Sequence, residues 1–270
     1  MREISAESDW AKRSGWHAPF ADTHSLAELT LRAANDYVHT FADTFNTERA
    51  PLYGHLVLAR SALESSVICW WLSEPGIARD ERIRRGLSEY IYSAVEEQLL
   101  DLVPDADQHV AAFIDHATRL EWQVKDYNGK LWSSKSRGKP RVDGVGRPPG
   151  AAGIASLLTD DQTSKIGRVQ WSRLSAVSHV TFWGLRSAFD DDGAVSDPLS
   201  GRAEVPVGTD ARSVSLQAIC LLKALRRAAD AMFELMGWQD HAWRAAATAA
   251  EDLERQLLDA LKPHLSAMRP

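Results

Sequence analysis

Apolar residues recur every three to four positions over most of the chain, which is the period of an amphipathic α-helix. The pattern predicts helices at about 22–45, 51–73, 83–99, 105–124, 151–158, 165–189, 209–236 and 240–265. Strand-like alternation is almost absent, and a short hairpin near 203–207 is the only sheet that we expect. The sequence therefore predicts an all-α protein, a single-domain bundle of seven to eight helices.

The pattern also predicts where the bundle begins and where it is interrupted. Residues 1–22 lack a clear helical period and form an N-terminal arm, and 23–270 form one helical domain. From 125 to 150 apolar residues are sparse while glycine and proline accumulate, which indicates a long loop or an insertion.

This loop or insertion is basic in an acidic chain. Seven lysines and arginines and two aspartates lie between 125 and 147, a local charge of +5 against -6 for the whole chain. Tyr127 and Trp132 lie among them. Cations next to aromatic rings suit phosphates and unstacked bases, although a solvated loop has the same composition. The candidate nucleic-acid contacts are Lys135, Arg137, Lys139 and Arg141.

Composition narrows the class of protein further. Of the 270 residues 44% are hydrophobic and ten are tryptophan, enough for a sizeable core. The two cysteines, Cys69 and Cys220, stand apart in apolar runs and fit a reducing compartment. The polar N-terminus resembles no signal peptide, and no apolar run is long enough to cross a membrane. We therefore expect a cytoplasmic protein that is not associated with membranes.

Two apolar helices carry polar residues, and these are the candidate site. The helix at 51–73 is apolar on all sides but contains Arg60 and Glu64, which share one face at a spacing of four. The pair fits either a structural ion pair that fixes helix register or charged groups lining a cavity. We expect both residues to be mostly buried and in contact with each other or with the later helix that contains His179.

The helix at 165–189 contains Arg173, Ser175 and His179 among tryptophans. Ser175, His179 and Trp183 follow one another at intervals of four, so they share a face. A histidine in this setting could be a structural core residue or a general acid and base.

Arg173 and His179 have the spacing Arg-x5-His. Together with the Arg60-x-x-x-Glu64 helix, this motif resembles the HEPN superfamily, in particular its divergent all-helical bacterial members. The resemblance implies a dimeric helical bundle and a metal-independent endoribonuclease. In such an enzyme Arg173 would stabilise the scissile phosphate, and His179 would transfer protons at a site shared by two copies.

Two alternatives remain open beside an RNA- or nucleotide-binding protein. One is a catalytically inert scaffold whose Arg60, Glu64 and His179 form a structural polar core. The other is a small-molecule enzyme or binding protein with an aromatic cavity. Its walls would be Trp70, Trp71, Trp171 and Trp183. The chain has no His-Glu-x-x-His motif, so we expect no metal and no other cofactor.

Overall fold

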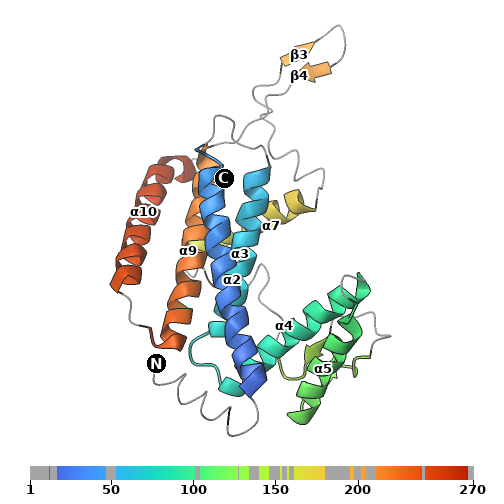
Figure 1. Cartoon of the computed structure of the whole chain (residues 1–270). Coiled ribbons are helices and arrows are strands. Elements are labelled where there is room, and N and C mark those ends of the chain that lie inside the picture. Colours follow the sequence, from blue (N-terminus) through green and yellow to red (C-terminus); the bar gives the residue numbers. More distant parts are fainter. Residues whose placement is uncertain are drawn as a thin grey trace. The chain divides into compact units, whose positions relative to one another are not determined.

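The helical periodicity is realised almost throughout the part of the chain that the structure describes. The computed structural model describes residues 12, 17–46, 53–100, 104–126, 128–133, 140–145, 153, 157, 161–179, 195–197, 202–204, 211–238 and 241–266. Among them are seven helices and two short antiparallel strand pairs (Figure 1). The helices are α2 (His17–Asp43), α3 (Gly54–Ser73), α4 (Arg79–Leu99), α5 (Ala106–Arg119), α7 (Asp161–Ser178), α9 (Ala211–Met236) and α10 (His241–Ser266). The predicted all-α fold is confirmed.

One strand pair was expected and the other was not. Strands β3 (Val195–Asp197) and β4 (Arg202–Glu204) form the hairpin predicted near 203–207, somewhat earlier in the chain. Strands β1 (Val124–Lys125) and β2 (Arg141–Val142) pair at the two ends of the basic segment, where no sheet was expected. Runs of two residues are too short to show the alternation that identifies a strand.

The start of α2 and the end of α5 differ from the predictions. Helix α2 begins at His17, so six residues assigned to the N-terminal arm are helical. Helix α5 ends at Arg119 instead of continuing to Val124. There the backbone enters the left-handed region at Glu121 (φ 60°), and the amide of Trp122 donates to the carbonyl of Ala117 at 2.9 Å. This is a Schellman motif, which ends a helix.

Close contacts divide the chain into two compact units. Unit 1 consists of Met1–Leu29, Cys69–Arg147 and Ala231–Trp238, and unit 2 of Thr30–Ile68, Pro148–Asp230 and Gln239–Pro270. Helices α2, α3 and α9 contribute residues to both.

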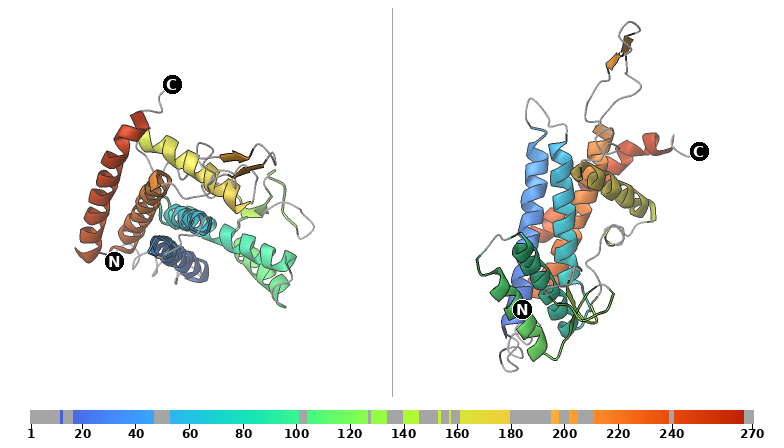
Figure 2. Two further views of the ribbon diagram at one scale, coloured as in Figure 1. Left: turned by 90° about the horizontal axis from the view of Figure 1, so that it is seen from above. Right: turned by 90° about the vertical axis from the view of Figure 1, so that its right-hand side faces the viewer.

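Unit 1 is organised around α4 and α5, which pack against each other (Figures 1 and 2). Ile83, Leu87 and Ile91 form the buried stripe of α4. Helix α4 approaches α2 closely at Gly86. A Cβ atom built there would lie 2.7 Å from the Cβ of Thr23, so only glycine permits this approach. Thr23 is therefore a buried packing residue inside α2.

Unit 2 contains the parts of α2, α3 and α9 that lie side by side, together with α7 and α10 (Figures 1 and 2). Leu56 and Leu63 from α3, Leu174 from α7, and Ile219 and Leu221 from α9 are almost fully buried. Their burial contributes to the hydrophobic stabilisation of this unit. Arg60 and Glu64 of α3 lie in unit 2, together with Arg173 and Ser175 of α7.

Candidate functional site

Helix α7 carries Arg173 and ends next to His179, and its buried face is well defined. Gln170, Leu174 and Val177 follow the i, i+4, i+7 spacing and are all buried. Trp171 lies on one flank of this face and Arg173 on the other, according to the rotation of 100° per residue. The helix therefore presents its two candidate binding residues to two different neighbours.

On one flank, α7 contacts α3. The Arg60 guanidinium lies over the ring of Trp171, 5.5 Å from its centroid, and Arg60 Nε donates to Glu64 Oε1 at 3.0 Å. The predicted Arg60–Glu64 contact is present. Burial was predicted for both, but only the Arg60 side chain is nearly covered, at 17% exposed, whereas Glu64 is 42% exposed. Helix α3 is thus not enclosed on all sides, and Val57 on the same side is also exposed.

On the other flank, α7 contacts α9. Arg173 Nη1 donates to the hydroxyl of Ser213, and Gln217 Nε2 donates to the same oxygen at 3.3 Å. Ser213 and Gln217 lie one turn apart on α9, and both are buried. The sequence analysis did not identify these two residues. The signal that could have found them is a pair of polar residues four positions apart on an otherwise apolar face of α9.

His179 follows the last residue of α7 and is exposed. Its amide donates to the carbonyl of Ser175 at 3.0 Å, so the backbone keeps the helical path to this point. On an ideal helix, Arg173 and His179 are about 120° apart around the axis and about 9 Å apart along it. One copy of α7 therefore directs the arginine toward α9 and leaves the histidine in solvent, and the two are not brought together.

The other predicted site residues have mixed placements. Ser175 is half-buried on the outer side of α7. Trp183 lies outside the described residues, as do Lys135, Arg137 and Lys139. Arg141 is half-buried in β2, opposite Lys125 of β1.

The base of the basic segment is firmly attached to α4. The amide of Val142 donates to Ser88 Oγ at 3.0 Å, and Arg84 Nη1 donates to the carbonyl of Asp143 at 3.2 Å. The Arg84 guanidinium also covers the ring of Trp122. A 2.6 Å ion pair joins Lys125 to Asp143, and this hydrogen bond lowers the pKa of the Asp143 carboxyl. Strands β1 and β2, which flank residues 126–140, are therefore paired with each other and held against α4.

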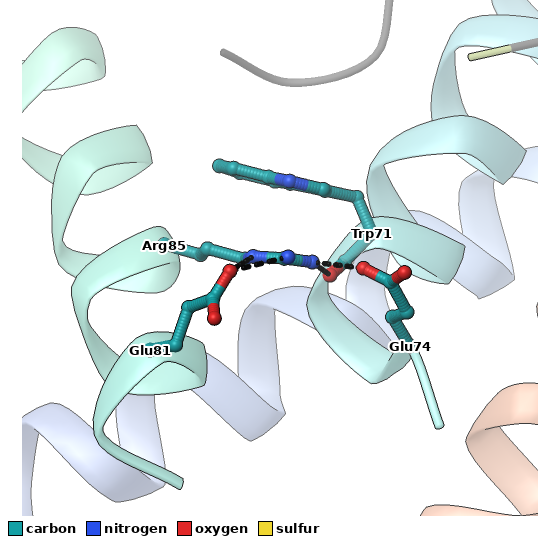
Figure 3. Close-up of polar contacts among 4 residues, drawn as sticks. All are labelled: Trp71, Glu74, Glu81 and Arg85. Atoms are coloured by element: carbon teal, nitrogen blue, oxygen red, sulfur yellow. Dashed lines mark hydrogen bonds and ion pairs between the residues drawn. The ribbon is translucent and has the colours of Figure 1, made fainter. Parts of the chain in front are cut away.

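The most heavily paired side chain in unit 1, Arg85, was not among the predicted site residues. Its guanidinium donates to the carbonyl of Trp71 and to Glu74 Oε2, both at 2.6 Å, and to Glu81 Oε1 at 3.1 and 2.6 Å (Figure 3). The Trp71 ring lies over the guanidinium plane. These contacts join α4 to the end of α3. The role of Arg85 is therefore structural.

The tryptophans of the proposed aromatic cavity have separate partners. Trp71 covers Arg85, and Trp171 faces Arg60. In the part of the chain that the structure describes, no group of three or more His, Cys, Asp or Glu residues could hold a metal ion. None of the described helices combines the length and apolarity that a membrane span requires.

Comparisons of the chain with protein-family models, curated proteins and solved structures give no match in any of the three.

Proposed function

We propose that this chain is a HEPN-like helical protein that binds RNA or a nucleotide and, as a homodimer, cleaves RNA without a metal ion. The observation that carries the proposal is the contrast along α7. Arg173 is held in place by a buried hydroxyl, whereas His179, six residues later, is exposed at the end of the helix.

The two side chains suit the two tasks of RNA cleavage. A guanidinium binds phosphate oxygens and stabilises the charge that develops on them in the transition state. An imidazole can take the proton of the attacking 2′-hydroxyl and return one to the leaving oxygen near neutral pH.

Because Arg173 and His179 point in different directions on one helix, the proposal requires a second copy. A two-fold axis near the end of α7 would allow the exposed His179 of one chain to approach the Arg173 side of the other. The predicted dimer is thus part of the active site in this proposal.

The basic segment supplies the electrostatic attraction that the acidic chain lacks elsewhere. Lys135, Arg137, Lys139 and Arg141 are proposed phosphate contacts, and β2 fixes Arg141 at the base of the segment. Each contact releases counterions, so RNA affinity should fall steeply with salt. The compartment that we propose is the cytoplasm, because free cysteines such as Cys69 and Cys220 fit a reducing environment.

The test uses the purified chain with a labelled RNA at low salt in the presence of EDTA. We expect cleavage by the native protein, loss of cleavage with retained binding for His179→Ala, and loss of cleavage with weakened binding for Arg173→Ala. A general acid and base contributes on the order of 10²- to 10⁴-fold to the reaction rate. We therefore expect His179→Ala to lower the rate of RNA cleavage by about 10²-fold or more. His39→Ala, which removes another exposed histidine, is the matched control.

A specific observation favours a second candidate, the inert scaffold. Arg60 pairs with Glu64 and Trp171, and Arg173 pairs with Ser213, so both arginines also hold α7 against its neighbours. If the native protein neither binds nor cuts RNA, and Arg173→Ala mainly lowers the melting temperature, the scaffold is the better account.

A further inference from the structure

Ser213 and Gln217 are two buried polar residues on α9. Neither was predicted from the sequence, and neither has a role in the proposed cleavage reaction. Ser213 is 6% exposed and lies in the first turn of α9, and Gln217, one turn later, is 1% exposed. The Ser213 hydroxyl accepts hydrogen bonds from Arg173 Nη1 and from Gln217 Nε2. Ser213 therefore connects Arg173 to a residue that is fully enclosed.

The carboxamide of Gln217 is not explained by stability alone. Its Oε1 atom is buried and accepts no hydrogen bond from any of the residues that the structure describes. A buried acceptor without a donor opposes folding, and an apolar side chain of similar size would avoid that cost. The single hydrogen bond that the amide does make is the one that holds the Ser213 oxygen, and hence the acceptor of Arg173.

We propose that Ser213 and Gln217 are positioning residues that fix the guanidinium of Arg173 for phosphate binding. This inference rests on the proposed function, because it assigns Arg173 the phosphate-binding role. A guanidinium on a flexible side chain loses rotational freedom when it binds an anion. A hydrogen bond from one edge of the guanidinium to a fixed hydroxyl removes that freedom in advance, which makes phosphate binding more favourable.

The variants are Ser213→Ala, Ser213→Thr and Gln217→Met, with Ser215→Ala as the matched control. The Ser215 hydroxyl donates to the carbonyl of Ala211 in the same helix and not to Arg173. We expect Ser213→Ala to weaken RNA binding about tenfold to a hundredfold, the value of a hydrogen bond to a charged group, and Ser213→Thr to restore most of it. The loss caused by Ser213→Ala should disappear in an Arg173→Ala background, because the positioned group is then absent.

Gln217→Met separates positioning from structural support. Removal of the unpaired oxygen should leave the melting temperature unchanged or raise it by about 2–4 °C. RNA affinity should nevertheless fall about three- to tenfold, because Ser213 loses the donor that fixes it. A purely structural role predicts that stability and affinity fall together. That result, or affinities equal to that of Ser215→Ala for both positions, would overturn the proposal.

A measurement without RNA distinguishes failure of this inference from failure of the proposed function. In ¹⁵N-labelled protein, a held guanidinium gives separate, slowly exchanging side-chain signals for Arg173, identified by their loss in Arg173→Ala. Ser213→Ala and Gln217→Met should merge these signals, and Ser215→Ala should not. If the signals merge as expected but the native protein does not bind RNA, the positioning is correct and the proposed ligand is wrong. Signals that the variants leave unchanged refute the positioning itself.

Discussion

A single side chain, Arg85, connects α4 to the end of α3. Helix ends leave carbonyl groups without partners inside the helix, and the carbonyl of Trp71 is one of the last four of α3. Arg85 satisfies this carbonyl and pairs with Glu74 and Glu81 at the same time, which uses the planar fork of the guanidinium fully (Figure 3). A lysine has the charge but not the geometry.

Arg85→Lys is therefore expected to destabilise the protein by about 1–3 kcal/mol. The figure is moderate because Glu74 and Glu81 are partly exposed and water can replace their lost partner. Urea unfolding gives the free energy of unfolding directly. Arg119→Lys, at a surface pair with Asp115, is the control and should change it by about 0.5 kcal/mol or less. Equal effects at the two positions would contradict the role of Arg85.

The sequence predicted contacts within a helix better than contacts between helices. Arg60 and Glu64 were identified as a pair because a spacing of four residues places them on one face. Their burial was overestimated, because it depends on which neighbours cover that face. Arg85 and Ser213 were missed for the same reason, since Trp71, Glu74 and Arg173 come from other parts of the chain.

Helices α5 and α9 both end in a Schellman motif, but different residue types occupy the left-handed position. At the end of α9, Gly237 is left-handed (φ 62°) and the amide of Trp238 donates to the carbonyl of Phe233 at 2.9 Å. Phe233 and Trp238 also pack edge to face, as the motif prefers. At the end of α5 the left-handed position is occupied by Glu121, which has a Cβ atom that disfavours this conformation.

Glu121→Gly should therefore stabilise the protein. Relief of the left-handed strain outweighs the greater freedom of glycine in the unfolded chain, and the expected net gain is about 0.5–1 kcal/mol. The reverse change, Gly237→Ala, should cost about 1 kcal/mol. Thermal unfolding of both variants checks the pair, and a loss of stability for Glu121→Gly would show that its side chain has a role of its own.

Charged side chains of α9 and α10 lie close together where the two helices meet. Glu254 on α10 is buried. Its Oε2 atom lies 4.0 Å from Lys223 Nζ, and its Oε1 atom lies 3.7 Å from Arg226 Nε. Arg226 makes a closer pair with the exposed Glu251, at 2.9 Å. Burial is the larger influence on Glu254 and raises the pKa of its carboxyl, despite the two cations.

This arrangement predicts a specific dependence of stability on pH. Since the pKa of Glu254 is higher in the folded chain than its ordinary value of 4.5, the folded state binds the proton more tightly. Its contribution is then most favourable at low pH and falls as the pH rises from 4.5 through the raised pKa. Glu254→Gln removes this fall, so its stability relative to the native protein should increase from about pH 5 to about pH 8.

Urea unfolding at both pH values measures the change, and Glu251→Gln controls for loss of an exposed pair with Arg226. A stability difference between Glu254→Gln and the native protein that stays constant with pH would show that the folded chain does not perturb this carboxyl.

Helix position was the most predictable property of the elements, because the 3.6-residue period extends over many residues. The C-terminal end of α3 and the start of α10 agree with the predictions to within one residue. The end of α5 does not, because the left-handed turn at Glu121 uses a residue type that gives no signal for it.

For the whole molecule, periodicity determines the all-α class but not which groups meet on the surface. The net charge of -6 would disfavour RNA binding if the charge were uniform, whereas the excess of +5 in 125–147 confines the attraction to one segment. Likewise the Arg-x5-His motif predicted a site, while the path of α7 separates its two residues within one chain. The proposed active site therefore requires two copies of the chain to form a dimer. The hydrophobic pattern of one chain does not show which surfaces would meet in that dimer.

Mixing two inactive variants tests this dependence on assembly. Arg173→Ala keeps the histidine and His179→Ala keeps the arginine, so a dimer containing one of each has one site with both groups and one with neither. In an equal mixture about half of the two-fold dimers are mixed, and about a quarter of the native activity should return. A site within a single chain would give no recovery at any mixing ratio. Cleavage of the labelled RNA after the two proteins have exchanged subunits measures the recovery, with each variant alone as the control.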